Sequence, residues 1–103
     1  LPFLDQKRTY RCFQIKGDSM PPVEEGSWVT ASFVQDWGDI KDGESYIVVS
    51  KDEGIMFKRL YSELESEGSL TLVSTNSLYA PFQLQASDIL EIWKFETWNA
   101  FHF

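Results

Sequence analysis

A serine and a lysine in this chain have the side-chain types of a nucleophile and its base. Ser19 lies in GDSMPP (residues 17–22), and Lys58 lies in GIMFKRL (residues 54–60). A serine hydroxyl is a weak nucleophile until a neighbouring group accepts its proton. A lysine amine can accept it when burial lowers its pKa from the usual value of about 10.4. The two residues predict a serine–lysine dyad, provided that the fold brings them together.

The sequence around Lys58 alternates in a way that is typical of a β-strand. Side chains on a strand point to opposite faces in turn, so Met56, Lys58 and Leu60 share one face. We therefore expect Lys58 to be largely buried between two apolar neighbours, which favours its neutral amine. The alternative is that its ammonium reaches solvent along those neighbours. The strand pattern alone leaves both interpretations open.

The residues around Ser19 predict a stiff turn. Gly17 permits a sharp exit from the preceding strand, and Pro21 and Pro22 restrict the backbone that follows. Asp18 or Ser19 could instead simply cap a short helical turn expected near residues 19–25. Capping and catalysis are compatible, because the first N–H groups of such a turn point into the space in front of the serine.

The remaining chain has the pattern of a mainly β domain. Short apolar runs are separated by Gly, Pro, Asn, Asp or Ser at intervals of roughly eight to twelve residues. KDEG (residues 51–54) predicts a tight hairpin. We expect six or seven strands in bent antiparallel sheets, with one or two short helical turns and no long helix. The expected strands cover residues 9–16, 27–34, 45–50, 55–60, 70–74 and 89–97, and residues 75–86 are expected to be a loop.

Composition narrows the classes of function. The chain has 103 residues, enough for one domain, and a net charge of −7 that disfavours direct binding to nucleic acid. It contains neither an apolar run long enough to span a membrane nor a secretory leader, and its single cysteine, Cys12, fits a reducing cytoplasm. His102 is interpreted as a tail residue and not a ligand. No metal and no cofactor are expected.

In order along the chain, these segments resemble the LexA-like family of serine–lysine peptidase domains, the C-terminal part of SOS and phage-type repressors. The resemblance rests on IKGDSMPPVEEGSWVTASF (residues 15–33), YIVVSKDEG (46–54) and IMFKRL (55–60). LVSTNSLYAPFQL (72–84) and DILEIWKFE (88–96) are similar to the family's later loop and final strand. The spacing of the serine and the lysine also agrees with the family, whose fold is of the bent LexA and signal-peptidase type.

The resemblance implies a role for each residue of the site. Ser19 would be the nucleophile and Lys58 the general base. The backbone N–H groups near Asp18 and Ser19 would hold the oxyanion, Gly17 would support the turn, and Met20 would pack beneath it. Such domains cut one Ala-Gly or Cys-Gly bond in their own chain, which separates a dimerising half from a helix-turn-helix half that binds DNA.

The sequence departs from this pattern in two respects. It contains no Ala-Gly or Cys-Gly pair, and it begins at Leu1 without a DNA-binding half. We expect it to be the C-terminal peptidase and dimerisation domain of a longer protein, spanning residues 1–103, that contacts DNA only through a missing N-terminal part. An activated recombinase filament is a candidate trigger for cleavage.

Several functions remain open at this stage. The first is a repressor's self-cleaving C-terminal domain, and the second is a UmuD-like accessory subunit of a translesion polymerase. A third is a dimerisation module with a vestigial dyad. A type I signal peptidase is disfavoured, because it needs a membrane anchor and a different sequence after its lysine. A helix-turn-helix upstream would indicate the repressor, and a short arm the polymerase subunit.

The C-terminal sequence ILEIWKFETWNAFHF (residues 89–103) predicts a homodimer. Its aromatic residues are Trp93, Phe95, Trp98, Phe101 and Phe103. Alternation gives both faces of the expected strand apolar residues, and a strand at a sheet edge buries only one face against its own core. The other face would pack on a second copy, where Trp and Phe are favoured. The alternative is that the tail folds back over its own domain.

Overall fold

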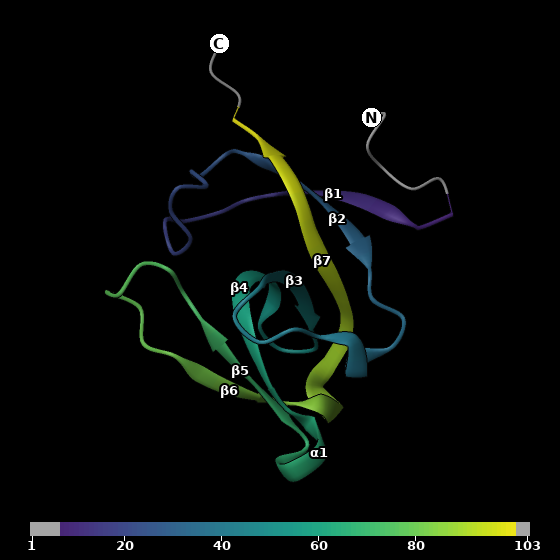
Figure 1. The fold of residues 1–103 in the computed structure, drawn as a ribbon. Helices are drawn as coiled ribbons and strands as arrows, with labels where there is room; N and C mark the ends of the chain where they lie inside the picture. The colour runs from purple at the N-terminus through teal and green to yellow at the C-terminus, as the bar shows by residue number, and fades with distance from the viewer. Residues whose placement is uncertain (1–6, 101–103) are drawn as a thin grey trace.

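The computed structural model describes residues 7–100, which form one antiparallel sheet of seven strands in the order β1-β2-β7-β3-β4-β5-β6 (Figure 1). The mainly β fold predicted from the sequence is confirmed. The strands are β1 (Tyr10–Gln14), β2 (Trp28–Phe33), β3 (Ser45–Ser50), β4 (Gly54–Glu63), β5 (Ser69–Val73), β6 (Phe82–Gln85) and β7 (Ile89–Asn99). The helical segments are α1 (Leu64–Glu67) and the 3-10 turns η1 (Trp37–Asp39) and η2 (Ala86–Asp88).

The hairpin of β3 and β4 sets the position of Lys58. The turn at residues 51–54 closes with Gly54 at a φ of 71°, a left-handed conformation that glycine adopts without a steric penalty. The hydroxyl of Ser50 accepts a hydrogen bond from the N–H of Glu53 at 2.8 Å. From this turn the register runs in regular steps and places Lys58 opposite Tyr46. The tight hairpin predicted from the sequence is therefore present.

Strand β7 runs the length of the molecule and joins its two halves (Figure 1). On one side it pairs with β2 and on the other with β3. Because successive side chains point to opposite faces, Trp93 belongs to one apolar cluster and the adjacent Ile92 to another. Ile89 also lies in the second cluster, beyond an irregularity in the register with β3 at Val49 and Ser50. The first cluster also contains Phe13, Ile15, Met20, Val23, Val29, Ala31, Ile47 and Phe57. The second also contains Ile40, Tyr46, Val48, Leu60, Leu70, Leu72 and Leu84.

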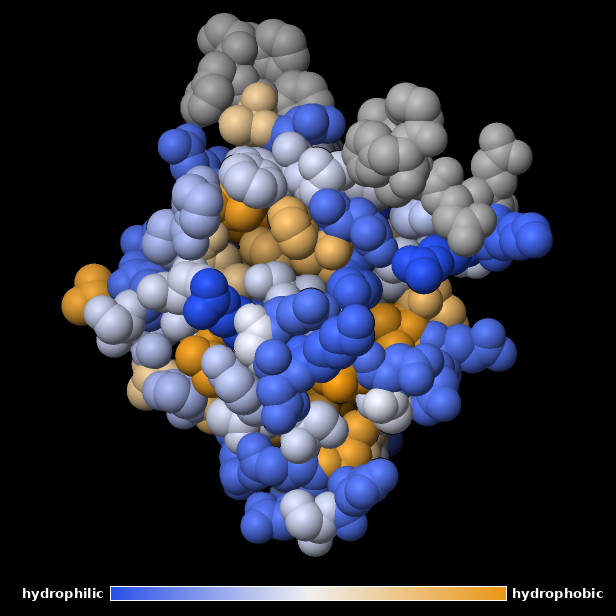
Figure 2. Space-filling model, viewed as in Figure 1, coloured by the Kyte–Doolittle hydropathy of each residue, from blue (hydrophilic) through white to orange (hydrophobic). Residues whose placement is uncertain are grey.

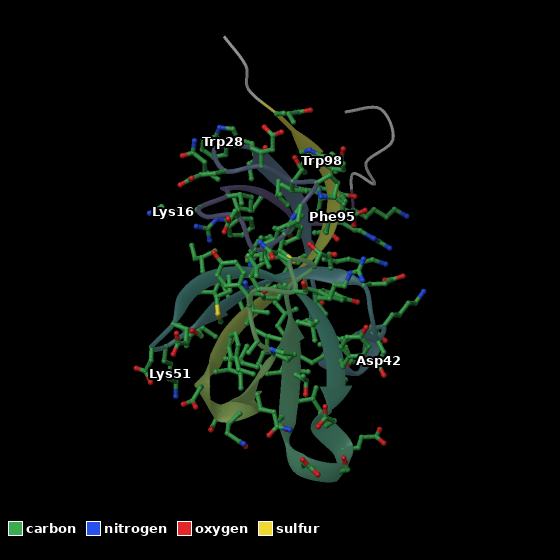
Figure 3. The ribbon with its side chains drawn as sticks, turned by 90° about the vertical axis from the view of Figure 1, so that its left-hand side faces the viewer. Lys16, Trp28, Asp42, Lys51, Phe95 and Trp98 are labelled. Atoms are coloured by element: carbon green, nitrogen blue, oxygen red, sulfur yellow. The ribbon has the colours of Figure 1, made fainter. Side chains whose placement is uncertain are left out.

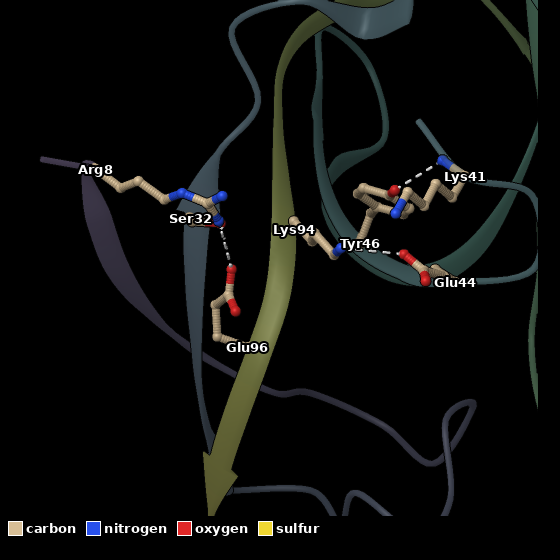
Figure 4. Close-up of polar contacts among 7 residues, drawn as sticks. All are labelled: Arg8, Ser32, Lys41, Glu44, Tyr46, Lys94 and Glu96. Carbon is tan, nitrogen blue, oxygen red and sulfur yellow. Dashed lines mark hydrogen bonds and ion pairs between the residues drawn. The ribbon is translucent and has the colours of Figure 1, made fainter. Parts of the chain in front are cut away.

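Polar contacts tie the central strands together across the sheet (Figure 4). Ser32 of β2 donates a hydrogen bond to Glu96 of β7 at 2.6 Å. Lys94 of β7 forms an ion pair with Glu44, just before β3, at 3.2 Å.

Outside these contacts, hydrophobic side chains reach the surface in several patches between hydrophilic residues (Figure 2). The core is therefore flanked by exposed apolar surface as well as by charged groups.

Two local expectations need correction. The helical turn expected at residues 19–25 is a series of bends and turns, closed by the N–H of Val23 donating to the carbonyl of Met20 at 2.9 Å. The Pro21–Pro22 peptide bond is cis. The expected loop at residues 75–86 contains β6, whose Leu84 is buried against the second cluster. A helical turn does form, at α1, where Gly68 ends it in the left-handed conformation.

The sequence analysis expected the C-terminal strand at an edge of the sheet, but β7 lies between β2 and β3. It lies inside the sheet and not at an edge, so both Ile92 and Trp93 are buried by the domain's own core. Trp98, near the end of β7, is 38% exposed. Phe101, His102 and Phe103 lie outside the described residues. Within β7, the aromatic surface left for a partner is therefore restricted to the last part of the strand.

Candidate active site

The structure brings Ser19 and Lys58 into direct contact. Lys58 Nζ lies 2.8 Å from Ser19 Oγ, within hydrogen-bond distance. Ser19 comes from the serine loop, which we define as residues 15–27 between β1 and β2, and Lys58 comes from the middle of β4. The expected proximity of these side chains is observed. A lysine amine at this distance can accept the serine's proton once it has lost its own.

Lys58 is only partly buried, which is less than the sequence analysis expected. Its strand neighbours explain part of this burial, since Leu60 lies in the second cluster and Met56 packs against that cluster. Removal of water from around the ammonium lowers the pKa of Lys58 below its ordinary value of 10.5. Partial burial thus favours the neutral amine that a general base requires, while a path to solvent remains for the proton.

The serine loop is anchored next to its nucleophile by Met20. This side chain is buried in the first cluster beside Phe13, Ile15 and Val23. Its sulfur also accepts a hydrogen bond from the N–H of Thr75 at 3.4 Å. At the start of the loop, Gly17 has a φ of 78°. Met20 is therefore buried next to Ser19, and Gly17 has a conformation that other residues rarely adopt.

Residues 75–79 hold the other side of the serine loop, and the sequence analysis assigned no role to them. Thr75 donates from its hydroxyl to the carbonyl of Pro21 at 2.8 Å. The backbone N–H of Asn76 donates to the carbonyl of Ser19 at 3.0 Å, and its side-chain Nδ2 donates to the carbonyl of Asp18 at 3.1 Å. This segment falls in the stretch that resembles the family's later loop, so the resemblance was the only signal for it.

Tyr79 completes the surroundings of the dyad. Its hydroxyl donates to the carboxylate of Asp18, and Lys58 Nζ lies 5.8 Å from the centre of its ring. The hydrogen bond to Asp18 raises the pKa of Tyr79 above its ordinary value of 10.0, and the negative charge of Asp18 raises it further. Tyr79 therefore loses its proton at a higher pH than an ordinary tyrosine does.

A cleft of about 620 Å³ lies beside the dyad. It is lined by Ser19 and Lys58, by residues of β1 and β4, and by apolar side chains that include Phe13, Ile15 and Phe57. Strand β1 is the outermost strand of the sheet at this end, so one of its edges lacks a strand partner within residues 7–100. Such an edge can accept an extended peptide as an additional strand.

A mainly antiparallel β domain that places a serine hydroxyl on a lysine amine beside an open cleft has the architecture of a serine–lysine peptidase domain. The family model described as Peptidase S24-like matches residues 2–94. The chain therefore belongs to the Peptidase S24-like family, and the resemblance to LexA-like domains is confirmed. A search of curated proteins gave no significant match. No helix within residues 7–100 has the length and apolar character needed to cross a bilayer.

Proposed function

We propose that this chain is the self-cleaving and dimerising C-terminal domain of a helix-turn-helix transcriptional repressor, with Ser19 as nucleophile and Lys58 as general base. The observation that carries the proposal is the 2.8 Å contact between Ser19 Oγ and Lys58 Nζ. The lowered pKa of Lys58 supports it, because a base must be neutral to accept a proton. A module with a vestigial dyad would show the same contact without cleavage, so the self-cleavage experiment below distinguishes the two.

The reaction follows from the geometry of the two side chains. Neutral Lys58 takes the hydroxyl proton of Ser19 as Oγ attacks the carbonyl carbon of the scissile peptide bond. The carbonyl oxygen becomes an oxyanion, which the backbone N–H groups of Asp18 and Ser19 would stabilise. Collapse of this intermediate breaks the C–N bond, and the Lys58 ammonium returns the proton to the leaving amine. Water then releases the acyl group from Ser19 by the same route in reverse.

An extended peptide is the substrate that best fits the cleft. The free edge of β1 offers backbone N–H and C=O groups that can pair with such a peptide. The apolar side chains lining the cleft would take its uncharged side chains. We propose that the substrate is a segment of the parent chain upstream of the domain, since the 103 residues contain no Ala-Gly or Cys-Gly bond.

A homodimer through the end of β7 forms the second part of the proposal. Beyond Lys94, β7 pairs with β2 alone, so its other edge has no strand partner within residues 7–100. Figure 3 shows Trp28, Phe95 and Trp98 at this end of the molecule, and the ring centres of Phe95 and Trp98 lie 5.9 Å apart. A second copy could pair with the free edge and bury these rings, as aromatic residues commonly do at interfaces. Dimerisation would let two DNA-binding halves read paired half-sites.

Self-cleavage of the full-length parent protein tests the proposal. The parent is incubated over a range of pH values, and its fragments are separated by gel electrophoresis and identified by mass. We expect cleavage to accelerate as pH rises, and to be abolished by Ser19→Ala and by Lys58→Ala. Lys51→Ala, which changes an exposed lysine in the β3–β4 turn, is the matched control and should cleave normally. Cleavage that survives both dyad substitutions would refute the assignment.

The same chemistry would serve a UmuD-like accessory subunit. The two functions differ in what precedes the domain and not in the dyad. Reading the complete gene distinguishes them, because a helix-turn-helix upstream supports the repressor and a short arm supports the polymerase subunit.

A further inference from the structure

The two peptide groups that flank Ser19 are both held by Asn76. Its side-chain Nδ2 donates to the carbonyl of Asp18 at 3.1 Å, and its backbone N–H donates to the carbonyl of Ser19 at 3.0 Å. The amide of Asn76 is itself oriented, because Oδ1 accepts a hydrogen bond from the N–H of Leu78 at 3.0 Å. One residue therefore fixes the rotation of two successive peptide planes at the nucleophile.

This fixation determines where two N–H groups point. In a trans peptide the carbonyl and the following N–H lie in one plane and point in opposite directions. The Asp18 carbonyl faces Asn76, so the N–H of Ser19 points away from residues 75–79. The N–H of Met20 does the same, because the Ser19 carbonyl also faces Asn76. The cleft is lined by Ser19 and Met20 and by none of residues 75–79, so it does not border the segment that the two carbonyls face.

We infer that Asn76 is a positioning residue for the proposed reaction, acting through the Asp18–Ser19 peptide to aim the Ser19 N–H at the oxyanion. The inference rests on the proposed function, and it adds a residue and a role to it. A donor aimed in advance stabilises the charge that develops in the transition state, because it does not have to reorient during the reaction. Without the Nδ2 contact, the peptide plane is free to rotate and the donor is no longer held in place.

The side chain of asparagine is specific to this role. Asn76→Asp keeps the shape and an acceptor for the Leu78 N–H, but it replaces the donor to the Asp18 carbonyl by an oxygen. Asn76→Ala removes both contacts. Neither change alters the backbone N–H that binds the Ser19 carbonyl, so both variants test the Asp18–Ser19 peptide. Ser77→Ala changes a neighbouring residue of the same loop and is the matched control.

The test uses a small fluorophosphonate, which needs no peptide-binding site. Ser19 Oγ forms a bond to phosphorus, fluoride leaves, and Lys58 takes the hydroxyl proton, while the phosphonyl oxygen gains negative charge in the transition state. The rate is followed by intact mass across pH until it reaches a plateau, where Lys58 is neutral in every variant. The plateau reports the geometry of the donors, whereas the midpoint reports the titration of Lys58. Thermal unfolding of each variant shows whether it is folded at the assay temperature.

We expect Asn76→Asp and Asn76→Ala to lower the plateau rate by about tenfold or more, while Ser77→Ala matches wild type. Equal plateau rates in wild type and both Asn76 variants would overturn the inference and leave Ser19 as the nucleophile. An effect confined to the midpoint would also overturn it, because Asn76 would then act on Lys58. A wild-type chain that does not react at Ser19 would overturn the proposed function and this inference together.

A second measurement does not depend on the variants. In the phosphonyl adduct of the wild-type chain, the amide proton of Ser19 should donate to the phosphonyl oxygen. Its NMR resonance should therefore move downfield relative to the free protein. An amide proton that does not shift on adduct formation would contradict the proposed orientation of the Asp18–Ser19 peptide.

Discussion

Lys58 Nζ lies 2.8 Å from Ser19 Oγ, although the two residues are 39 positions apart in the chain. Two independent features of the fold produce this contact. The register of the β3–β4 hairpin places Lys58 opposite Tyr46, and the burial of Met20 anchors the serine loop above it. Because neither feature depends on a bound substrate, the dyad is assembled in the free domain. This pre-assembly leads to predictions about reactivity, stability and assembly.

The reactivity of Ser19 should depend on pH through Lys58. Desolvation lowers the pKa of Lys58 below 10.5, so the neutral amine becomes the major form at a pH below that value. The rate of phosphonylation by a fluorophosphonate should rise with pH through the Lys58 pKa and level off. A midpoint at or above 10.5, or the same profile in Lys58→Ala, would contradict the assignment of the base.

Replacement of Lys58 by methionine should make the domain more stable at neutral pH. Below the folded-state pKa the lysine is charged in both states, and only the folded state bears the loss of hydration. Between that pKa and 10.5 the unfolded state binds the proton and the folded state does not, so wild-type stability increases with pH. The advantage of Lys58→Met should therefore decrease over this interval. Urea unfolding of both proteins at several pH values measures the difference in their free energies of unfolding. A difference that grows with pH would contradict the lowered pKa of Lys58.

Truncation of Met20 should destabilise the fold as well as the site. The side chain is 4% exposed, and its removal leaves a cavity in the first apolar cluster. A buried methionine replaced by alanine typically lowers the free energy of unfolding by about 2–5 kcal/mol. The control is Leu78→Ala, because Leu78 is 88% exposed and its loss should change stability by less than about 0.5 kcal/mol. Equal urea midpoints for the two variants would show that Met20 does not anchor the serine loop.

A charge at the end of β7 should dissociate the proposed dimer. Trp98→Asp places a carboxylate where the second copy would bury an aromatic ring, and buried unpaired charges strongly disfavour association. In sedimentation equilibrium the wild type should approach twice the chain mass of 11.9 kDa, and the variant should remain at that mass. Leu90→Asp changes an even more exposed residue at the other end of the same strand and should leave the dimer intact. A wild type that stays monomeric at all concentrations would remove the dimer from the proposal.

The sequence predicted the strands and the lysine because both follow a simple period. Alternation along residues 54–60 placed Lys58 among apolar neighbours, and the hairpin at residues 51–54 was clear from its turn residues. Strand β6 was missed because it is only four residues long, contains two glutamines, and follows Pro81. The extent of Lys58 burial was overestimated, since alternation identifies a face of the sheet but not how completely other elements cover it.

The hydrogen bonds around Ser19 could not be predicted from local patterns. Asn76 and Tyr79 lie more than fifty residues from Asp18, and polar residues in an irregular segment have no periodicity that indicates their partners. The short turn after Ser19 was expected to be helical, because serine followed by prolines is typical of a helix start. The contacts of residues 75–79 with this turn stabilise a different backbone path, and only the tertiary fold reveals them.

The site of phosphonylation tests the central claim most directly. The chain is treated with a fluorophosphonate at a pH where Lys58 is neutral, digested, and mapped by tandem mass spectrometry. The serine–lysine dyad predicts a single adduct on Ser19, which is absent in Ser19→Ala and forms at least about a hundredfold more slowly in Lys58→Ala. An adduct on another residue, or an equal rate of labelling at Ser19 without the Lys58 amine, would contradict it.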